Sequence, residues 1–184
     1  MKDFIIIHSE CCLVKEGMQS KERCFILPNQ SINDAPTDIQ HLFVCGFGEY
    51  RDDKLILSNN SFNQPKSITI GNNCFQNVRE FVVDGLESLE SVKIGENCFR
   101  ISYKERNDGV CRITNCQNLR QLEIGDWSFA DFKSFELSNL NSIQSIMFGD
   151  YCFEYADLSL KGEWKEWKKE RMKCDLKMIM KMMF

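Results

Sequence analysis

The chain has 184 residues, 43% hydrophobic and 27% charged, a composition typical of one soluble globular domain with a sizeable core. Its formal net charge of −4 argues against a nucleic-acid partner. The apolar run Phe4–Ile7 is shorter than a signal peptide or a membrane span requires, so we expect a cytoplasmic protein.

Two short apolar segments in the first 40 residues predict strands. They read "DFIIIHS" at 3–9 and "RCFILPN" at 23–29. We interpret residues 1–40 as capping strands that close the N-terminal end of a repeat region, since the end units of repeat proteins must face water on one side. This repeat region is predicted to span residues 41–160, followed by a separate segment at 161–184.

One element recurs four times within the repeat region, as "IGNNCF", "IGENCF", "IGDWSF" and "FGDYCF". The glycines of these copies are separated by 24, 30 and 24 residues: Gly71, Gly95, Gly125 and Gly149. An alternating segment precedes each glycine ("SITIG", "SVKIG", "QLEIG", "SIMFG"), and alternation of period two is the strand pattern. The residues predicted to point inward are Ile68, Ile70, Val92, Ile94, Leu122, Ile124, Ile146 and Phe148.

A second alternating segment in each unit predicts a second strand. Its inward residues would be Phe81, Val83, Cys111, Ile113, Phe135, Leu137, Leu158 and Leu160. A phenylalanine stands four residues after each repeated glycine, which predicts an aromatic column in the core: Phe75, Phe99, Phe129 and Phe153. Gly, Asn and Asp at the turns fit because they tolerate positive φ or bond to nearby backbone.

A degenerate unit comes before these copies. Val44 and Leu57 are thirteen residues apart, the same separation as Ile70 and Val83. We therefore predict about five coils, each with two strands. The 30-residue spacing contains extra polar residues between Phe99 and Val110, which predicts either a binding loop or a tolerated surface bulge.

The segment 161–184 differs from the rest of the chain because it is basic and rich in methionine. Apolar residues at helical spacing predict a short C-terminal helix: Met172, Leu176, Ile179, Met180 and Met183. Three interpretations stay open. The helix caps the last coil, it binds a partner groove or an anionic membrane, or the segment is a frayed end.

The units resemble leucine-rich repeats, in which LxxLxLxxN recurs. Leu89, Val92, Ile94 and Asn97 match this pattern. The "IG..CF" element is similar to the BspA-like branch of that family. In the two later units Trp127 and Tyr151 replace the asparagine, so an asparagine ladder cannot run through the whole stack. The resemblance implies a mainly β, right-handed solenoid that binds proteins or other ligands on exposed strand faces, and it implies no catalytic residues.

No motif for catalysis or for a cofactor is found. The chain lacks GxGxxG, GxxxxGK[ST], HExxH and GxSxG, and its two histidines, His8 and His41, are not placed beside cysteine clusters. We predict no enzyme activity, no cofactor and no metal site. The ten cysteines include no CxxC pair, and most are interpreted as buried thiols.

The candidate binding residues are the outward positions of the first strand in each unit. They are Ser67, Thr69, Ser91, Lys93, Gln121, Glu123, Ser145 and Met147. Lys93 and Glu123 are one coil apart and predict a cross-strand ion pair. The function that we expect is a non-catalytic scaffold for protein–protein interaction, with a solvated face that binds nothing as the simpler alternative.

A second function stays open, that of a cell-surface or secreted adhesion protein. Asn29 and Asn59 begin glycosylation acceptor patterns, although such short patterns also arise by chance.

Overall fold

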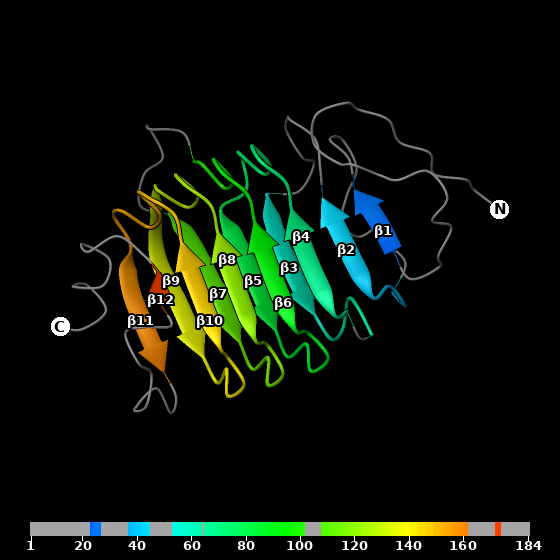
Figure 1. Cartoon of the computed structure of the whole chain (residues 1–184). Coiled ribbons are helices and arrows are strands. Elements are labelled where there is room, and N and C mark those ends of the chain that lie inside the picture. Colours follow the sequence, from blue (N-terminus) through cyan, green and yellow to red (C-terminus); the bar gives the residue numbers. More distant parts are fainter. Residues whose placement is uncertain are drawn as a thin grey trace.

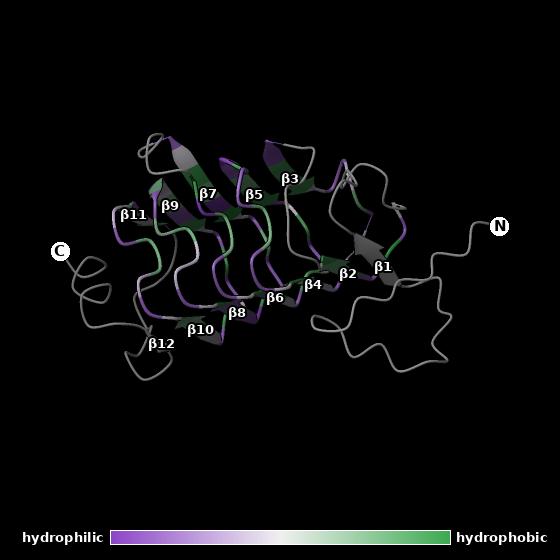
Figure 2. Ribbon diagram, turned by 90° about the horizontal axis from the view of Figure 1, so that it is seen from above, coloured by the Kyte–Doolittle hydropathy of each residue, from purple (hydrophilic) through white to green (hydrophobic). Residues whose placement is uncertain are grey.

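Two parallel β-sheets lie face to face in the structure, a computed structural model that describes residues 23–26, 37–44, 53–63, 65–101, 108–161 and 172–173 (Figures 1 and 2). The first sheet has seven strands in the order β1-β2-β4-β6-β8-β10-β12, and the second has five in the order β11-β9-β7-β5-β3. Because the chain alternates between the sheets, it winds as a β-solenoid of about four turns. The described residues contain no helix.

The strands agree with the predicted alternating segments. The first sheet consists of β1 (Arg23–Ile26), β2 (His41–Val44), β4 (Ser67–Ile70), β6 (Ser91–Ile94), β8 (Gln121–Ile124), β10 (Ser145–Phe148) and β12 (Met172–Lys173). The second consists of β3 (Lys54–Ser58), β5 (Glu80–Asp84), β7 (Gly109–Thr114), β9 (Phe132–Ser138) and β11 (Asp157–Lys161). Five pairs of strands, from β2 and β3 to β10 and β11, lie at the positions of the five predicted coils, and the complete winding amounts to about four turns.

The core lies between the sheets and contains the predicted inward residues. Every such residue from Ile68 to Phe148 is buried, whereas Leu158 and Leu160 in the last coil are partly buried. The four phenylalanines form the predicted column, with ring centroids 5.1 Å apart for Phe75–Phe99, 4.5 Å for Phe99–Phe129 and 4.9 Å for Phe129–Phe153. Aromatic stacking and burial of apolar surface thus hold consecutive coils together.

The repeated glycines have a different role from the predicted one. Positive φ at these corners belongs to the phenylalanines and to the residues two positions after each glycine, and Gly85 is the one described glycine with positive φ. A Cβ atom on Gly125 would lie 2.7 Å from the carbonyl carbon of Gly95, and a Cβ atom on Gly149 would lie 2.8 Å from that of Gly125. The glycines are therefore required because backbones of neighbouring coils approach closely.

Both flanking segments contribute a strand to the first sheet. In the N-terminal segment, β1 pairs in parallel with β2 and lies within the predicted strand at 23–29, whereas residues 3–9 lie outside the described residues. In the C-terminal segment, Met172 and Lys173 pair with Ile146 and Met147 of β10. The helix prediction is wrong for these two residues, because strand pairing satisfies backbone groups at the edge of β10. The rest of the predicted helix lies outside the described residues.

The insertion in the third coil lies at one end of β7. Residues 102–107 lie outside the described residues, and the pairing of β7 with β9 shifts between Gly109 and Val110. A Cβ atom on Gly109 would lie 2.5 Å from the ring of Phe132, so this glycine lets the strand pack against the aromatic core.

Candidate functional site

The eight predicted binding residues form two straight rows on the outward face of the first sheet. Parallel pairing aligns Ser67, Ser91, Gln121 and Ser145 in one row and Thr69, Lys93, Glu123 and Met147 in the other. Each strand buries the intervening side chains, so the eight residues are exposed or half-buried on the opposite side. The structure therefore brings together all of the predicted residues on one surface.

Lys93 and Glu123 form the predicted ion pair in the middle of the second row. Lys93 Nζ lies 3.0 Å from Glu123 Oε2, and the two side chains are 59% and 40% exposed. Because water screens an exposed pair, the interaction contributes only about 0.2–1 kcal/mol to stability. A molecule that covers the pair would displace this water and contact both charges directly.

The same face extends to β2, which the sequence interpretation did not include in the site. His41 is aligned with Ser67 and Phe43 with Thr69, and His41 Nδ1 lies 2.8 Å from Ser67 Oγ. The signal was present in the sequence, since the separation of Val44 and Leu57 matches that of the inward residues Ile70 and Val83. With Phe43, the second row contains an aromatic, a hydroxyl, two opposite charges and a thioether.

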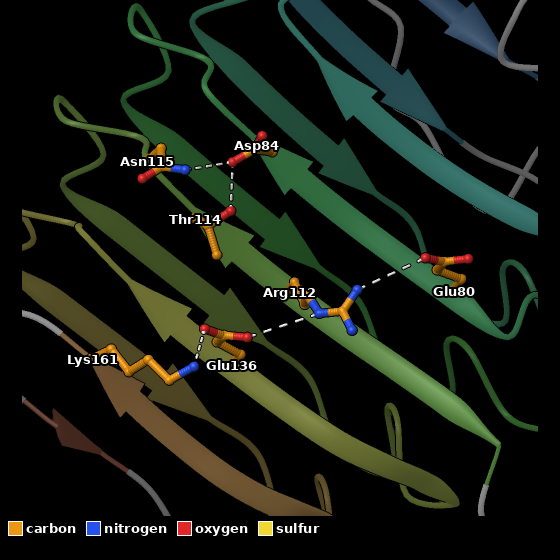
Figure 3. A network of polar contacts seen from close by, with 7 residues as sticks. All are labelled: Glu80, Asp84, Arg112, Thr114, Asn115, Glu136 and Lys161. Carbon is orange, nitrogen blue, oxygen red and sulfur yellow. Dashed lines mark hydrogen bonds and ion pairs between the residues drawn. The ribbon is translucent and has the colours of Figure 1, made fainter.

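The outward face of the second sheet carries a chain of alternating charges that was not predicted. Lys54 Nζ lies 2.9 Å from Glu80 Oε2, and Arg112 lies 3.9 Å from Glu80 Oε1 and 3.8 Å from Glu136 Oε2. Lys161 Nζ completes the chain at 2.9 Å from Glu136 Oε1 (Figure 3). The hydrogen bond to Glu80 is the main cause that raises the pKa of Lys54. Since each charge has an opposite neighbour, these three cations and two carboxylates connect the second-sheet strands of five successive coils.

Polar side chains also connect coils where the second-sheet strands end. Thr114 Oγ1 and Asn115 Nδ2 donate hydrogen bonds of 2.6 Å and 2.8 Å to the same carboxylate oxygen of Asp84 (Figure 3). Asn139 Nδ2 donates to Asn115 Oδ1 at 2.8 Å. These contacts are satisfied within the protein, which indicates a structural role for this edge.

Five cysteines of the described core are buried and form no disulfide, which agrees with the interpretation of these residues as buried thiols: Cys74, Cys98, Cys111, Cys116 and Cys152. Interaction with the Cys74 thiol and burial raise the pKa of Cys98, whereas burial raises that of Cys116 to about 11 and that of Cys152 to about 12. Such thiols are protonated at neutral pH and are poor nucleophiles.

The same hydrogen bond recurs at three of the corners that follow the first-sheet strands, where a side chain donates to a glycine carbonyl of the preceding coil. Cys98 Sγ donates to the carbonyl of Gly71 at 2.9 Å and Cys152 Sγ to that of Gly125 at 3.0 Å. Ser128 Oγ makes the equivalent bond to Gly95 at 2.7 Å. The thiols therefore serve as hydrogen-bond donors between coils.

Within the described part of the chain, no group of three or more His, Cys, Asp or Glu side chains could hold a metal ion. Among the same residues, no helix is long and apolar enough to cross a membrane. Comparison with protein-family models, curated proteins and solved structures finds no match for this chain. The geometry defines a β-solenoid repeat protein whose candidate site is the outward face of the first sheet.

Proposed function

We propose that the chain is a non-catalytic scaffold that binds another protein through the outward face of the first sheet. The observation that carries this proposal is the alignment of the two candidate rows across consecutive parallel strands. A regular backbone holds these positions at fixed spacing, so a partner would meet a surface whose backbone is already ordered. Residues of different chemistry in the second row give that surface a means of discriminating between partners.

We also propose that the coils are of the leucine-rich-repeat type, BspA-like branch, with the right-handed winding that this resemblance implies. The burial of Leu89, Val92 and Ile94 supports this proposal, since these are the apolar positions of the repeat pattern. A cytoplasmic location belongs to the same proposal. The free thiols of the described core are consistent with a reducing compartment.

The test compares two triple variants with matched chemistry. Lys93→Ala, Glu123→Ala and Met147→Ala remove one ion pair and one apolar side chain from the first-sheet face. The control, Lys54→Ala, Glu80→Ala and Ile56→Ala, removes an ion pair and an exposed apolar side chain from the second sheet, together with the contact of Glu80 to Arg112; Ile56 is 44% exposed. Both variants should keep the circular dichroism spectrum of the native protein.

Proximity labelling in the native cell, followed by affinity capture with purified candidates, is the readout. We expect the first-sheet variant to lose a partner that the wild-type protein and the control both bind. Equal binding by all three proteins would refute the proposed face. Labelling restricted to surface proteins, together with a glycan on Asn29 or Asn59, would favour the adhesion function instead.

A further inference from the structure

A second surface lies at the corner that follows each first-sheet strand. The residue two positions after the repeated glycine has a left-handed backbone in four coils, with φ of 59° at Asn73, 53° at Asn97, 60° at Trp127 and 60° at Tyr151. Asparagine tolerates this conformation, whereas a bulky aromatic residue rarely adopts it. The last two coils therefore hold two large rings at positions where a small polar residue fits more easily.

These two rings stack on each other at the surface. Their centroids are 4.1 Å apart with 15° between the planes, and the residues are 39% exposed at Trp127 and 46% exposed at Tyr151. The guanidinium carbon of Arg100 lies 5.7 Å from the centroid of Trp127. Arg100, Trp127 and Tyr151, called here the aromatic stack, come from three successive coils and run along the solenoid.

The aromatic stack is exposed, so it does not belong to the packed core. The phenylalanine column also has left-handed backbone, but it is buried, and burial of large rings offsets the backbone cost. Trp127 and Tyr151 are partly exposed, so burial offsets less of the cost of their left-handed backbone. Asn97 makes the same turn in the coil before Trp127. Exposed aromatic residues held rigidly in this way are typical of binding surfaces.

The charges around the stack indicate what it binds. Arg100 lies over Trp127 at one end, whereas no other ring or cation lies over Tyr151 among the described residues. Asp150 precedes Tyr151, and the backbone N–H of Asp150 donates to Asp126 Oδ1 at 2.9 Å, so two carboxylates lie in adjacent corners here. An aromatic face in an acidic setting attracts a cation.

We propose that the face of Tyr151 turned away from Trp127 binds an arginine side chain from a basic segment of a protein partner. The arrangement would repeat what Arg100 does on Trp127, where the guanidinium carbon lies 5.7 Å from the ring centroid. Asp150, the residue before Tyr151, adds a negative charge to this corner. This inference rests on the proposed function, since it supplies the chemistry of a protein partner, but it uses a different surface from the two candidate rows.

The probe is a short Gly/Ser-rich peptide with three arginines, and its control replaces each arginine with citrulline, which keeps the shape and removes the charge. Binding is followed by NMR through the backbone amide of Tyr151 and the indole N–H of Trp127. We expect the arginine peptide to shift both signals and the citrulline peptide to bind several-fold more weakly. Equal affinities, or no shift with the arginine peptide, would overturn the proposal.

Two variants test the ring itself. Tyr151→Asn places at this corner the residue that Asn97 already shows to be compatible with it, so the variant should fold, and we expect about two- to fivefold weaker binding of the arginine peptide. Tyr151→Phe keeps the ring and should keep the affinity. If Tyr151→Asn binds the peptide as well as wild type does, the peptide is attracted by the overall charge of the protein surface and the proposal is wrong.

The first-sheet triple variant distinguishes this inference from the proposed function. Lys93, Glu123 and Met147 do not belong to the stack, so their replacement should leave peptide binding unchanged. Loss of partner capture in that variant with normal peptide binding would support both surfaces independently. Loss of peptide binding in a correctly folded triple variant would place the peptide on the sheet and overturn the aromatic site.

Discussion

Replacing Gly125 with alanine should destabilise the protein, although the same change elsewhere often has the opposite effect. Where the backbone conformation is compatible, Gly→Ala stabilises a protein by about 0.4–1 kcal/mol because the unfolded chain loses freedom. The added Cβ atom at Gly125 would lie 2.7 Å from the carbonyl carbon of Gly95 and 2.8 Å from the backbone nitrogen of Glu96. Both atoms belong to the backbone of the preceding coil, so no side chain can rotate to make room.

The loss of stability depends on which parts of the structure must move to accommodate the alanine. Overpacking of a core typically costs about 1–3 kcal/mol when neighbouring side chains adjust. Here two coils must separate locally, which weakens strand pairing and phenylalanine stacking, so we expect a loss near the upper end, about 2–3 kcal/mol. For a chain of this length the melting temperature should fall by about 4–12 °C.

Urea unfolding followed by circular dichroism measures the loss, with Gly85→Asn as the matched control. Gly85 has φ of 67°, and asparagines with φ of 57° and 54° stand at the equivalent position in the next two coils, Asn115 and Asn139. A Cβ atom on Gly85 would meet its nearest neighbour at 3.5 Å, so the control should change stability by less than about 0.5 kcal/mol. A Gly125→Ala protein as stable as wild type would refute the close-approach explanation.

Three further predictions concern the thiols and the ion pair. Cys98→Ser should be nearly neutral, because a hydroxyl can donate to the Gly71 carbonyl just as Ser128 in the next coil donates to the Gly95 carbonyl. Cys111→Ser should cost about 1–3 kcal/mol, because it places a hydroxyl in a fully buried site of the described core that holds a thiol. Urea unfolding of both variants checks this difference. Native protein at pH 8 should resist alkylation at Cys98, Cys111, Cys116 and Cys152 until it unfolds, because raised pKa values keep these four thiols protonated, and site-resolved mass spectrometry measures this resistance. Since the same thiols ionise at lower pH in the unfolded chain, stability should fall as pH rises above about 9. A double-mutant cycle on Lys93 and Glu123 should give a coupling energy of about 0.2–1 kcal/mol that decreases with salt, and a coupling that does not respond to salt would contradict the exposed geometry.

Alternation and repeat spacing were sufficient to predict the strands of the four repeated units, their inward core residues and the rows of the candidate site. In the first sheet one register applies to every strand pair from β2 to β10, so side chains such as Lys93 and Glu123 are placed opposite each other once the repeat is recognised. The aromatic column follows from the same logic, because a residue that recurs at one position of each coil must lie beside its own copies.

Features that depend on three-dimensional approach were not predictable in this way. A repeated glycine is expected whether the corner needs positive φ or a close approach of two backbones. The φ angles of the repeated glycines and the 2.7 Å distance from a Cβ atom on Gly125 to the carbonyl carbon of Gly95 distinguish these explanations. The charge chain on the second sheet is another example. Arg112 is aligned with Val82 and Glu136, yet its long side chain also reaches diagonally to Glu80, and such reach is not encoded in spacing. At Met172, helical spacing of apolar residues was outweighed by pairing with an exposed strand edge.

The corner position occupied by Asn73, Asn97, Trp127 and Tyr151 explains how such a fold acquires specificity. Each coil contacts mainly its two neighbours, so a change on the outside of one coil is felt locally and leaves the glycine and phenylalanine columns unaltered. Two large rings could replace asparagine here because the side chain points out of the stack, and the backbone cost of about 1–2 kcal/mol per residue is partly offset by the contact between the rings. A single aromatic replacement would carry that cost without a stacking partner. The adjacent positions of Trp127 and Tyr151 are therefore coupled, and Trp127→Asn should weaken binding of the arginine peptide to Tyr151 even though Trp127 does not contact the ligand.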